Sequence, residues 1–192
     1  MKKILISTAV ALSALAVPTA ALAQARSAIL IVDSERVLTD CTACKSASTQ
    51  LQSKQAALRT RAQQLQTQLQ TEGKPIQAAV DALNGKAPDA ALQARIKAFQ
   101  TKEQSAQQEL ATGQRSLEST AANVQQQIGV KLIAIVEQVR ATRGASIVLS
   151  KNSTMANDAT IDVTTDVLNT LNQQLPAVSV TPLPQQTTPQ GR

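Results

Sequence analysis

The chain has 192 residues, a formal net charge of +6 and 43% hydrophobic positions. It contains no His, Trp or Tyr, and Phe99 is its one aromatic residue. Without His, the chain cannot form a Ser-His-Asp triad, a Cys-His nucleophile pair or a His-ligated zinc site. We therefore expect no enzymatic activity, no cofactor and no metal site.

The first 23 residues have the features of a secretory signal peptide. Lys2 and Lys3 make a positive start, an apolar run extends from Ile4 to Val17, and Ala21-Leu22-Ala23 forms a small-residue cleavage site. The apolar run is shorter than the roughly 20 residues that a membrane-spanning helix needs. We expect cleavage near Ala23 and a mature chain in a bacterial periplasm.

The basic charge is concentrated in the middle of the chain. Between Lys45 and Arg140 there are 12 basic and 7 acidic residues, and no carboxylate occurs from Cys41 to Thr71. This region is either a solvated helix surface or a binding surface for anionic lipid, lipopolysaccharide or an acidic polypeptide. Nucleic acid is the usual partner of a basic patch, but export makes it an unexpected one here.

The mature chain is predicted to begin with a strand and a short helix. Residues 28–32, Ala-Ile-Leu-Ile-Val, form a continuous aliphatic run that is typical of a strand buried on both faces. Asp33 or Ser34 is the expected N-cap of a short helix through Arg36, Val37 and Leu38.

A long helical hairpin is predicted over residues 45–127. From Leu51 to Leu83, core positions recur in alternating steps of four and three residues, which is the heptad pattern of a coiled coil. Pro75 is expected to kink this helix. It is not expected to end it, because the pattern resumes in phase at Ile76.

The second helix of the hairpin is predicted to return after a turn. Asn-Gly and Pro place this turn, the tip of the hairpin, at residues 84–89, with Asp89 as the next N-cap. The heptad pattern then continues from Leu92 to Leu117. Glu103 and Gly113 occupy two of its core positions, so we expect loose packing there. At about 1.5 Å per residue, the hairpin should be on the order of 70 Å long.

Residues 24–44 and 128–175 are predicted to form one small α/β body. Gly144 is the expected end of the long helix, and residues 145–149 are a second candidate for a buried strand. Two strands do not make a stable sheet alone, so we expect strands from several copies to share one sheet. The predicted fold class is α+β and mostly helical, with a long antiparallel hairpin arm projecting from an oligomerisation body.

The C-terminal part is predicted to contain one helix and a tail. The helix begins at Asp162 or Thr164 and stops at Pro176. Residues 176–192 are rich in Pro, Gln and Thr, which predicts a disordered tail. The apolar face of the helix consists of Val163, Val167, Leu168 and Leu171.

Cys41 and Cys44 form a C-x-x-C motif just before the long helix. In an oxidising compartment the pair can form a local disulfide, although the small loop limits its entropic benefit. A redox-active pair would require thioredoxin-like βαβ surroundings, which the pattern lacks. Two Cys alone would also make an incomplete zinc site.

The order strand, short helix, long helical hairpin, strand and terminal helix resembles the Skp (OmpH-like) family of periplasmic chaperones. Residues 28–33, Ala-Ile-Leu-Ile-Val-Asp, are similar to the opening strand of that family. Residues 162–168, Asp-Val-Thr-Thr-Asp-Val-Leu, resemble its closing D-[IV]-T-x-x-[VL]-[IL] helix. The resemblance extends from Ala28 to Leu171, and the C-x-x-C motif and the tail depart from the family pattern.

The resemblance implies a homotrimer in which three helical arms enclose a cavity, like the tentacles of a jellyfish. It also implies an ATP-independent holdase that binds unfolded outer-membrane β-barrel proteins in the periplasm of a Gram-negative bacterium. The alternative is a structural coiled-coil spacer or adaptor of the cell envelope. A third candidate, a thiol oxidoreductase, would depend on the two Cys residues.

If the chain is a holdase, we expect its arms to contact the client. The apolar candidates can equally be the seam between the two helices. The expected contacts are apolar Leu58, Leu65, Leu69, Ile76, Leu83, Leu92, Ile96 and Phe99, and basic Lys54, Arg59, Arg61, Arg95, Lys97 and Lys102.

Overall fold

The computed structural model describes residues 28–184 and confirms the predicted mostly helical α+β fold. The predicted signal peptide, residues 1–23, and the last residues, 185–192, lie outside the described part. In chain order the elements are β1 (Ala28–Val32), α1 (Ser34–Asp40), α2 (Thr42–Asp81), α3 (Ala90–Thr142), β2 (Ala145–Ser150), the 3-10 turns η1 (Lys151–Ser153) and η2 (Ala159–Ile161), and α4 (Thr164–Gln174).

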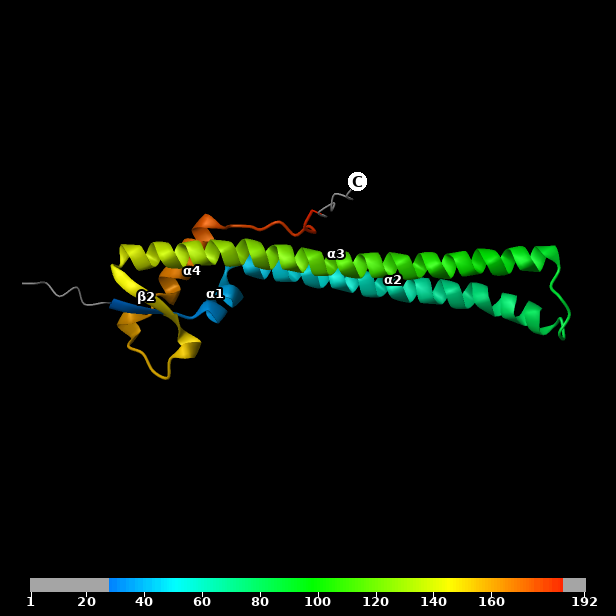
Figure 1. Cartoon of the computed structure of the whole chain (residues 1–192), viewed down its shortest axis with the longest axis horizontal. Helices are drawn as coiled ribbons and strands as arrows, with labels where there is room; N and C mark the ends of the chain where they lie inside the picture. Colours follow the sequence, from blue (N-terminus) through cyan, green and yellow to red (C-terminus); the bar gives the residue numbers. More distant parts are fainter. Residues whose placement is uncertain (1–27, 185–192) are drawn as a thin grey trace, which may run out of the picture.

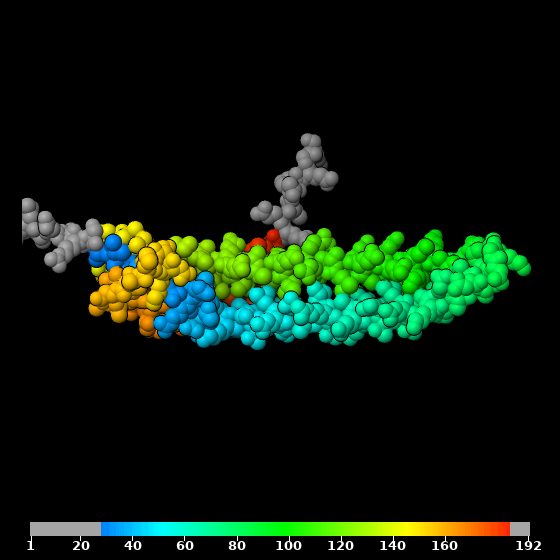
Figure 2. Space-filling view, turned by 90° about the horizontal axis from the view of Figure 1, so that it is seen from below, coloured from blue at the N-terminus to red at the C-terminus, as the bar shows by residue number. Residues whose placement is uncertain are grey.

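Helices α2 and α3 form a long antiparallel arm that projects from the body (Figures 1 and 2). The 40 residues of α2 give about 60 Å of helix, and this helix continues through Pro75 as predicted. The tip lies where it was expected, because Asn84 and Gly85 adopt positive φ angles of 49° and 85°. Asp89 then caps α3, its carboxylate accepting a hydrogen bond from the Leu92 N–H at 2.8 Å.

Two glycines allow the helices of the arm to approach closely. A Cβ added at Gly113 would lie 2.7 Å from Leu58 Cδ1, and one added at Gly73 would lie 2.9 Å from Phe99 Cζ. The expectation of loose packing at Gly113 is therefore wrong, because the Leu58 side chain fills the space that the missing Cβ leaves. At Glu103, by contrast, a groove of about 350 Å³ remains between the helices.

The two strands form a parallel pair, with Ile29 opposite Ile147 and Val32 opposite Ser150. On its other edge, β1 is partly covered, because the Ile31 carbonyl accepts a hydrogen bond from the Val163 N–H at 2.9 Å. Within the described residues, no further strand pairs with β2. The prediction of a second buried strand is wrong for the single chain, since Ile147 remains 44% exposed.

The core of the body joins strands, helices and the base of the arm. Residues Ala47 and Val124, which we assigned to the arm, belong to this core. Its centre is the most buried, with Ile135 and Leu171 at most 1% exposed. Burial of such a side chain stabilises the fold by about 1.5–3 kcal/mol. The core includes Leu30, Val32, Val37, Cys41, Ala43, Cys44, Ile128, Leu132, Val139, Val163, Val167 and Val180.

Helix α4 fixes the start of the arm through side chains that cap other elements. The buried Thr164 hydroxyl accepts a hydrogen bond from the Asp33 N–H at 2.8 Å, and Asn172 Oδ1 accepts one from the Thr42 N–H, also at 2.8 Å. Asp162 in turn accepts hydrogen bonds from the Thr164 N–H and the Lys151 ammonium. Thr164 therefore fixes the start of α1 and Asn172 fixes the start of α2, while Asp162 holds the start of α4 in place.

Residues 176–184 lie along α3 (Figure 1), so the prediction of a disordered tail is wrong for this segment. Helix α4 ends at Gln174, before Pro176 as predicted. Val178 then packs against the core and Val180 is buried within it. The Pro, Gln and Thr content indicated disorder. Composition cannot reveal the hydrogen bonds that this segment forms with α3, which lies far from it in the sequence.

We expect Thr164→Val to lower the free energy of unfolding by about 1–3 kcal/mol, because the Asp33 N–H would lose its acceptor. The exposed neighbour Thr165 offers a matched control, and Thr165→Val should change the stability by less than about 0.5 kcal/mol. Urea unfolding followed by circular dichroism measures both variants. Equal effects would contradict the capping role of Thr164.

Gly129→Ala should raise the free energy of unfolding by about 0.5–1 kcal/mol, because Ala favours helix and the site has open space. Gly73→Ala should gain less, since its methyl group would displace the Phe99 ring. The comparison uses the same urea titration. An equal gain at both positions would show that the close approach at Gly73 does not constrain the arm.

Candidate functional site

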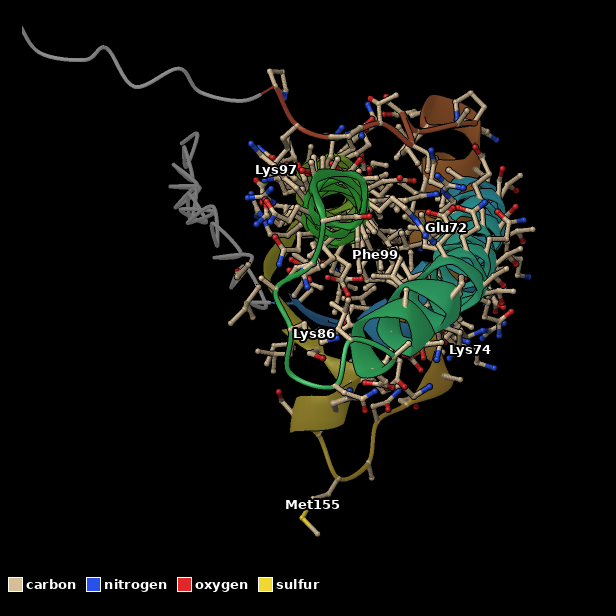
Figure 3. All side chains as sticks on the ribbon, turned by 90° about the vertical axis from the view of Figure 1, so that its right-hand side faces the viewer. Glu72, Lys74, Lys86, Lys97, Phe99 and Met155 are labelled. Atoms are coloured by element: carbon tan, nitrogen blue, oxygen red, sulfur yellow. A yellow bond between two sulfur atoms is a disulfide. The ribbon has the colours of Figure 1, made fainter. Side chains whose placement is uncertain are left out.

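The predicted apolar contact residues lie in the seam between α2 and α3. Leu65 and Leu92 are buried, and the other six are half-buried. Figure 3 shows Phe99 between the two helices, where it faces Gly73. In this arrangement the seam side chains hold the arm together, and only part of each is open to solvent.

Two of the predicted basic residues pair with carboxylates across the seam. Arg61 binds Glu109 with two hydrogen bonds of 2.6 and 3.1 Å. The hydrogen bond from the Arg61 guanidinium lowers the pKa of Glu109 below its ordinary value. Lys102 of α3 pairs with Glu72 of α2 in the same way. These exposed pairs join the two helices, and each contributes little to stability.

The other four predicted basic residues are exposed and available to a partner. Lys54 and Arg59 lie on α2, and Arg95 and Lys97 lie on α3. Within residues 28–184, none of them forms a salt bridge with a carboxylate. Figure 3 shows Lys97 pointing away from the seam. The arm therefore presents positive charge to solvent on both of its helices.

Shallow grooves lie along the arm, and the one near the tip brings apolar and basic residues together. Near the tip, a groove of about 420 Å³ is lined by Ile76, Phe99, Arg95 and Lys102. The groove beside Glu103 exposes parts of Leu65 and Leu69. At the base, a larger and mostly apolar groove of about 680 Å³ lies between α2 and α3. The tip groove, with an apolar wall edged by Arg95 and by the Lys102–Glu72 pair, suits an extended chain with mixed side chains. The residues of the base groove include Leu38, Cys44, Leu51, Leu117, Ala121, Val124, Ile128 and Leu132.

A second exposed apolar surface lies on the body, and sequence reasoning did not identify it. We call it the body face, and it consists of Ile29, Val130, Ile133 and Ile147, which are 44%, 65%, 72% and 44% exposed. A groove of about 520 Å³ adjoins it. The available signal was that α3 is apolar on several sides between residues 128 and 136, a pattern typical of a helix that is covered all round.

Cys41 and Cys44 form a disulfide at the junction of α1 and α2. Cys41 is the N-cap of α2, and its sulfur accepts a hydrogen bond from the Cys44 N–H at 3.0 Å. Both residues are buried in the core. A thiol oxidoreductase needs a thiolate that its substrate can reach. The burial of both Cys residues therefore favours a structural disulfide.

Residues 28–184 contain neither a metal-binding cluster nor a membrane-spanning helix. No three Cys, Asp or Glu side chains in this part come together as a metal site. None of its helices combines the length and the hydropathy needed to cross a bilayer.

Comparisons with known proteins agree with this architecture. The fold matches a candidate outer membrane chaperone (OmpH-like) from Caulobacter crescentus CB15, with a TM-score of 0.69 and 18% sequence identity. The match covers 84% of this chain and 93% of the other. No curated protein matches the sequence. The family model described as outer membrane protein (OmpH-like) matches residues 28–171, which is most of the chain. The chain therefore belongs to the OmpH-like family.

Proposed function

We propose that the protein is an ATP-independent holdase chaperone. It would bind unfolded outer-membrane β-barrel proteins in the periplasm of a Gram-negative bacterium and prevent their aggregation. The observation that carries this proposal is the combination of exposed cations and shallow apolar grooves along a long, thin arm. Membership of the OmpH-like family and the fold shared with a candidate outer membrane chaperone support it.

The chemistry of the arm suits a partner without fixed structure. Exposed cations attract an acidic unfolded chain over a distance of about 10 Å at moderate salt, before any contact forms. Weak contacts at several grooves then act together, so that binding is strong in sum although each contact is weak. Such binding requires no nucleotide, because it depends only on the affinity of the client for the arm.

We place the client contacts at the grooves and at the exposed cations beside them. Ile76 and Phe99 would contact apolar client side chains at the tip groove, where Arg95 lies beside them. Figure 1 shows α2 and α3 separating toward the tip. A further separation there would expose more of Leu83 and Leu92, which flank the turn.

We also propose that three copies assemble through the body face. The β2 strand has one unpaired edge within residues 28–184, and Ile133 lines a groove together with Ile147 of β2. A two-stranded parallel sheet with exposed isoleucines is unusual, because parallel sheets are normally covered on both faces. Copies of the same chain would cover the apolar side chains and leave the arms free.

Ile133→Asp should dissociate this assembly, because a carboxylate cannot be buried in an apolar interface without a partner. Sedimentation velocity should show a change from three chains to one. Val80 on α2 is also an exposed apolar residue, and Val80→Asp should leave the mass unchanged. A single-chain mass for the unsubstituted protein would contradict the proposed trimer.

Light scattering tests the holdase directly. A urea-unfolded outer-membrane β-barrel protein is diluted into buffer with residues 24–192 and without nucleotide, and we expect suppressed scattering. The arm variant K54Q/R59Q/R95Q/K97Q should need at least about threefold more protein for half-suppression, because it has lost its electrostatic attraction. The body variant R36Q/K45Q/K131Q/R143Q removes the same charge elsewhere and should match the unsubstituted protein.

The two possible failures have different meanings. Undiminished scattering with an excess of folded protein would contradict the holdase and favour the envelope spacer. Equal suppression by the arm and body variants would contradict only the placement of client contacts on the arm.

A further inference from the structure

The segment of residues 176–184 is held on α3 through its backbone. Gln127 Nε2 donates to the Ser179 carbonyl at 3.0 Å, and the Ser179 N–H donates to Gln127 Oε1 at 2.9 Å. One side-chain amide therefore binds both backbone groups of a single residue. This is the pairing that a neighbouring strand would provide in a sheet.

A single side-chain hydrogen bond to the segment follows at each of the next two helical turns. Asn123 Nδ2 donates to the Thr181 carbonyl at 3.0 Å, and Ser119 Oγ accepts from the Leu183 N–H at 3.0 Å. Four residues of helix rise about 6.0 Å, and two residues of an extended chain rise about 6.6 Å. A row of polar residues at four-residue spacing thus fits alternate residues of an extended chain. We call Ser119, Asn123 and Gln127 the α3 ladder.

The side chains of the bound segment alternate in polarity. Val178 and Val180 pack against the core, whereas Ser179 and Thr181 are exposed and bond to each other. Apolar and polar side chains also alternate along the strands of outer-membrane β-barrels. Residues 178–181 therefore share, over four residues, the alternation found in strands of the client class that we proposed above.

We propose that the α3 ladder is a binding site for extended polypeptide segments of alternating polarity, and that residues 176–184 are its intramolecular competitor. The inference rests on the proposed holdase function. The ladder contacts backbone atoms, which every polypeptide has, so it accepts many sequences. The two valines add an apolar requirement at alternate positions.

Residues 176–184 are attached to the same chain as the α3 ladder. This attachment explains how the ladder can be occupied in the free protein and still be available to a client. A segment attached to its own site has an effective concentration in the millimolar range. It excludes a single weakly bound foreign segment. A long client that also contacts the arm grooves gains further binding and displaces the tail. The tail would thus prevent binding of short peptides without preventing binding of unfolded proteins.

The test uses a fluorescent peptide of residues 176–184 and fluorescence anisotropy. It should bind residues 24–175, which lack the tail, and bind the mature chain, residues 24–192, at least about tenfold more weakly. In residues 24–175, Gln127→Ala should weaken peptide binding by about tenfold or more, because it removes two hydrogen bonds. Gln126, an exposed neighbour, provides the control, and Gln126→Ala should have no effect. A peptide N-methylated at Ser179 should also fail to bind.

A second variant guards against misfolding of the shortened chain. Ser179→Pro in the mature chain removes one N–H of the tail but keeps every core residue. It should bind the peptide more tightly than the unsubstituted protein and suppress client scattering at a lower protein concentration. Circular dichroism checks the helix content of each variant.

The peptide assay tests the α3 ladder, and the scattering assay tests the holdase, so the two proposals can be contradicted separately. If the peptide does not bind variants that retain their helix content, or binds the mature chain equally well, the ladder proposal is wrong. It is also wrong if the unsubstituted chain suppresses client scattering and release of the tail leaves that suppression unchanged. If no form suppresses scattering while the peptide still binds as expected, the holdase is wrong and the ladder remains a peptide site.

Discussion

The position of the arm depends on two side chains of α4. Thr164 and Asn172 bind backbone N–H groups at the starts of α1 and α2, and the core around Ile135 and Leu171 supports them. The Thr164 side chain is buried, and leaving a buried polar group unpaired costs about 1–3 kcal/mol. The α2 end of the arm is also held by the disulfide and by Ala43 and Ala47, which are buried in the core of the body. Helix α4 therefore helps to fix the base of the arm in the body.

Beyond its base in the body, the arm consists of only two helices, so it has little core. Its seam side chains are mostly half-buried, and its cross-helix ion pairs are exposed. Each contact is weak, but the close approaches at Gly73 and Gly113 keep the helices in register. An arm built in this way can separate locally without unfolding the body. This property distinguishes it from a stiff spacer, whose seam would be more fully buried.

Local patterns predicted the elements well, since a heptad repeat, an Asn-Gly turn and an Asp cap depend on neighbouring residues. Three features escaped prediction because they depend on distant ones. Gly113 was expected to loosen the seam, but its effect depends on Leu58, which lies far from it in the chain. The exposure of Ile133 depends on which surfaces the chain leaves uncovered. The fit of residues 176–184 to α3 depends on a spacing match between two segments whose sequences show no relation.

The pairing of β1 with β2 sets the order in which the protein can fold. Ala28 pairs with Ala145, and the whole arm lies between them in the sequence. The arm helices rely on nearby contacts and can form quickly, whereas the strand pair must wait for the closure of a very long loop. A chain that emerges N-terminus first therefore exposes its first strand until the arm has followed. During that interval the protein is itself an unfolded chain with an unpaired apolar strand, and it faces the same aggregation hazard as a β-barrel precursor.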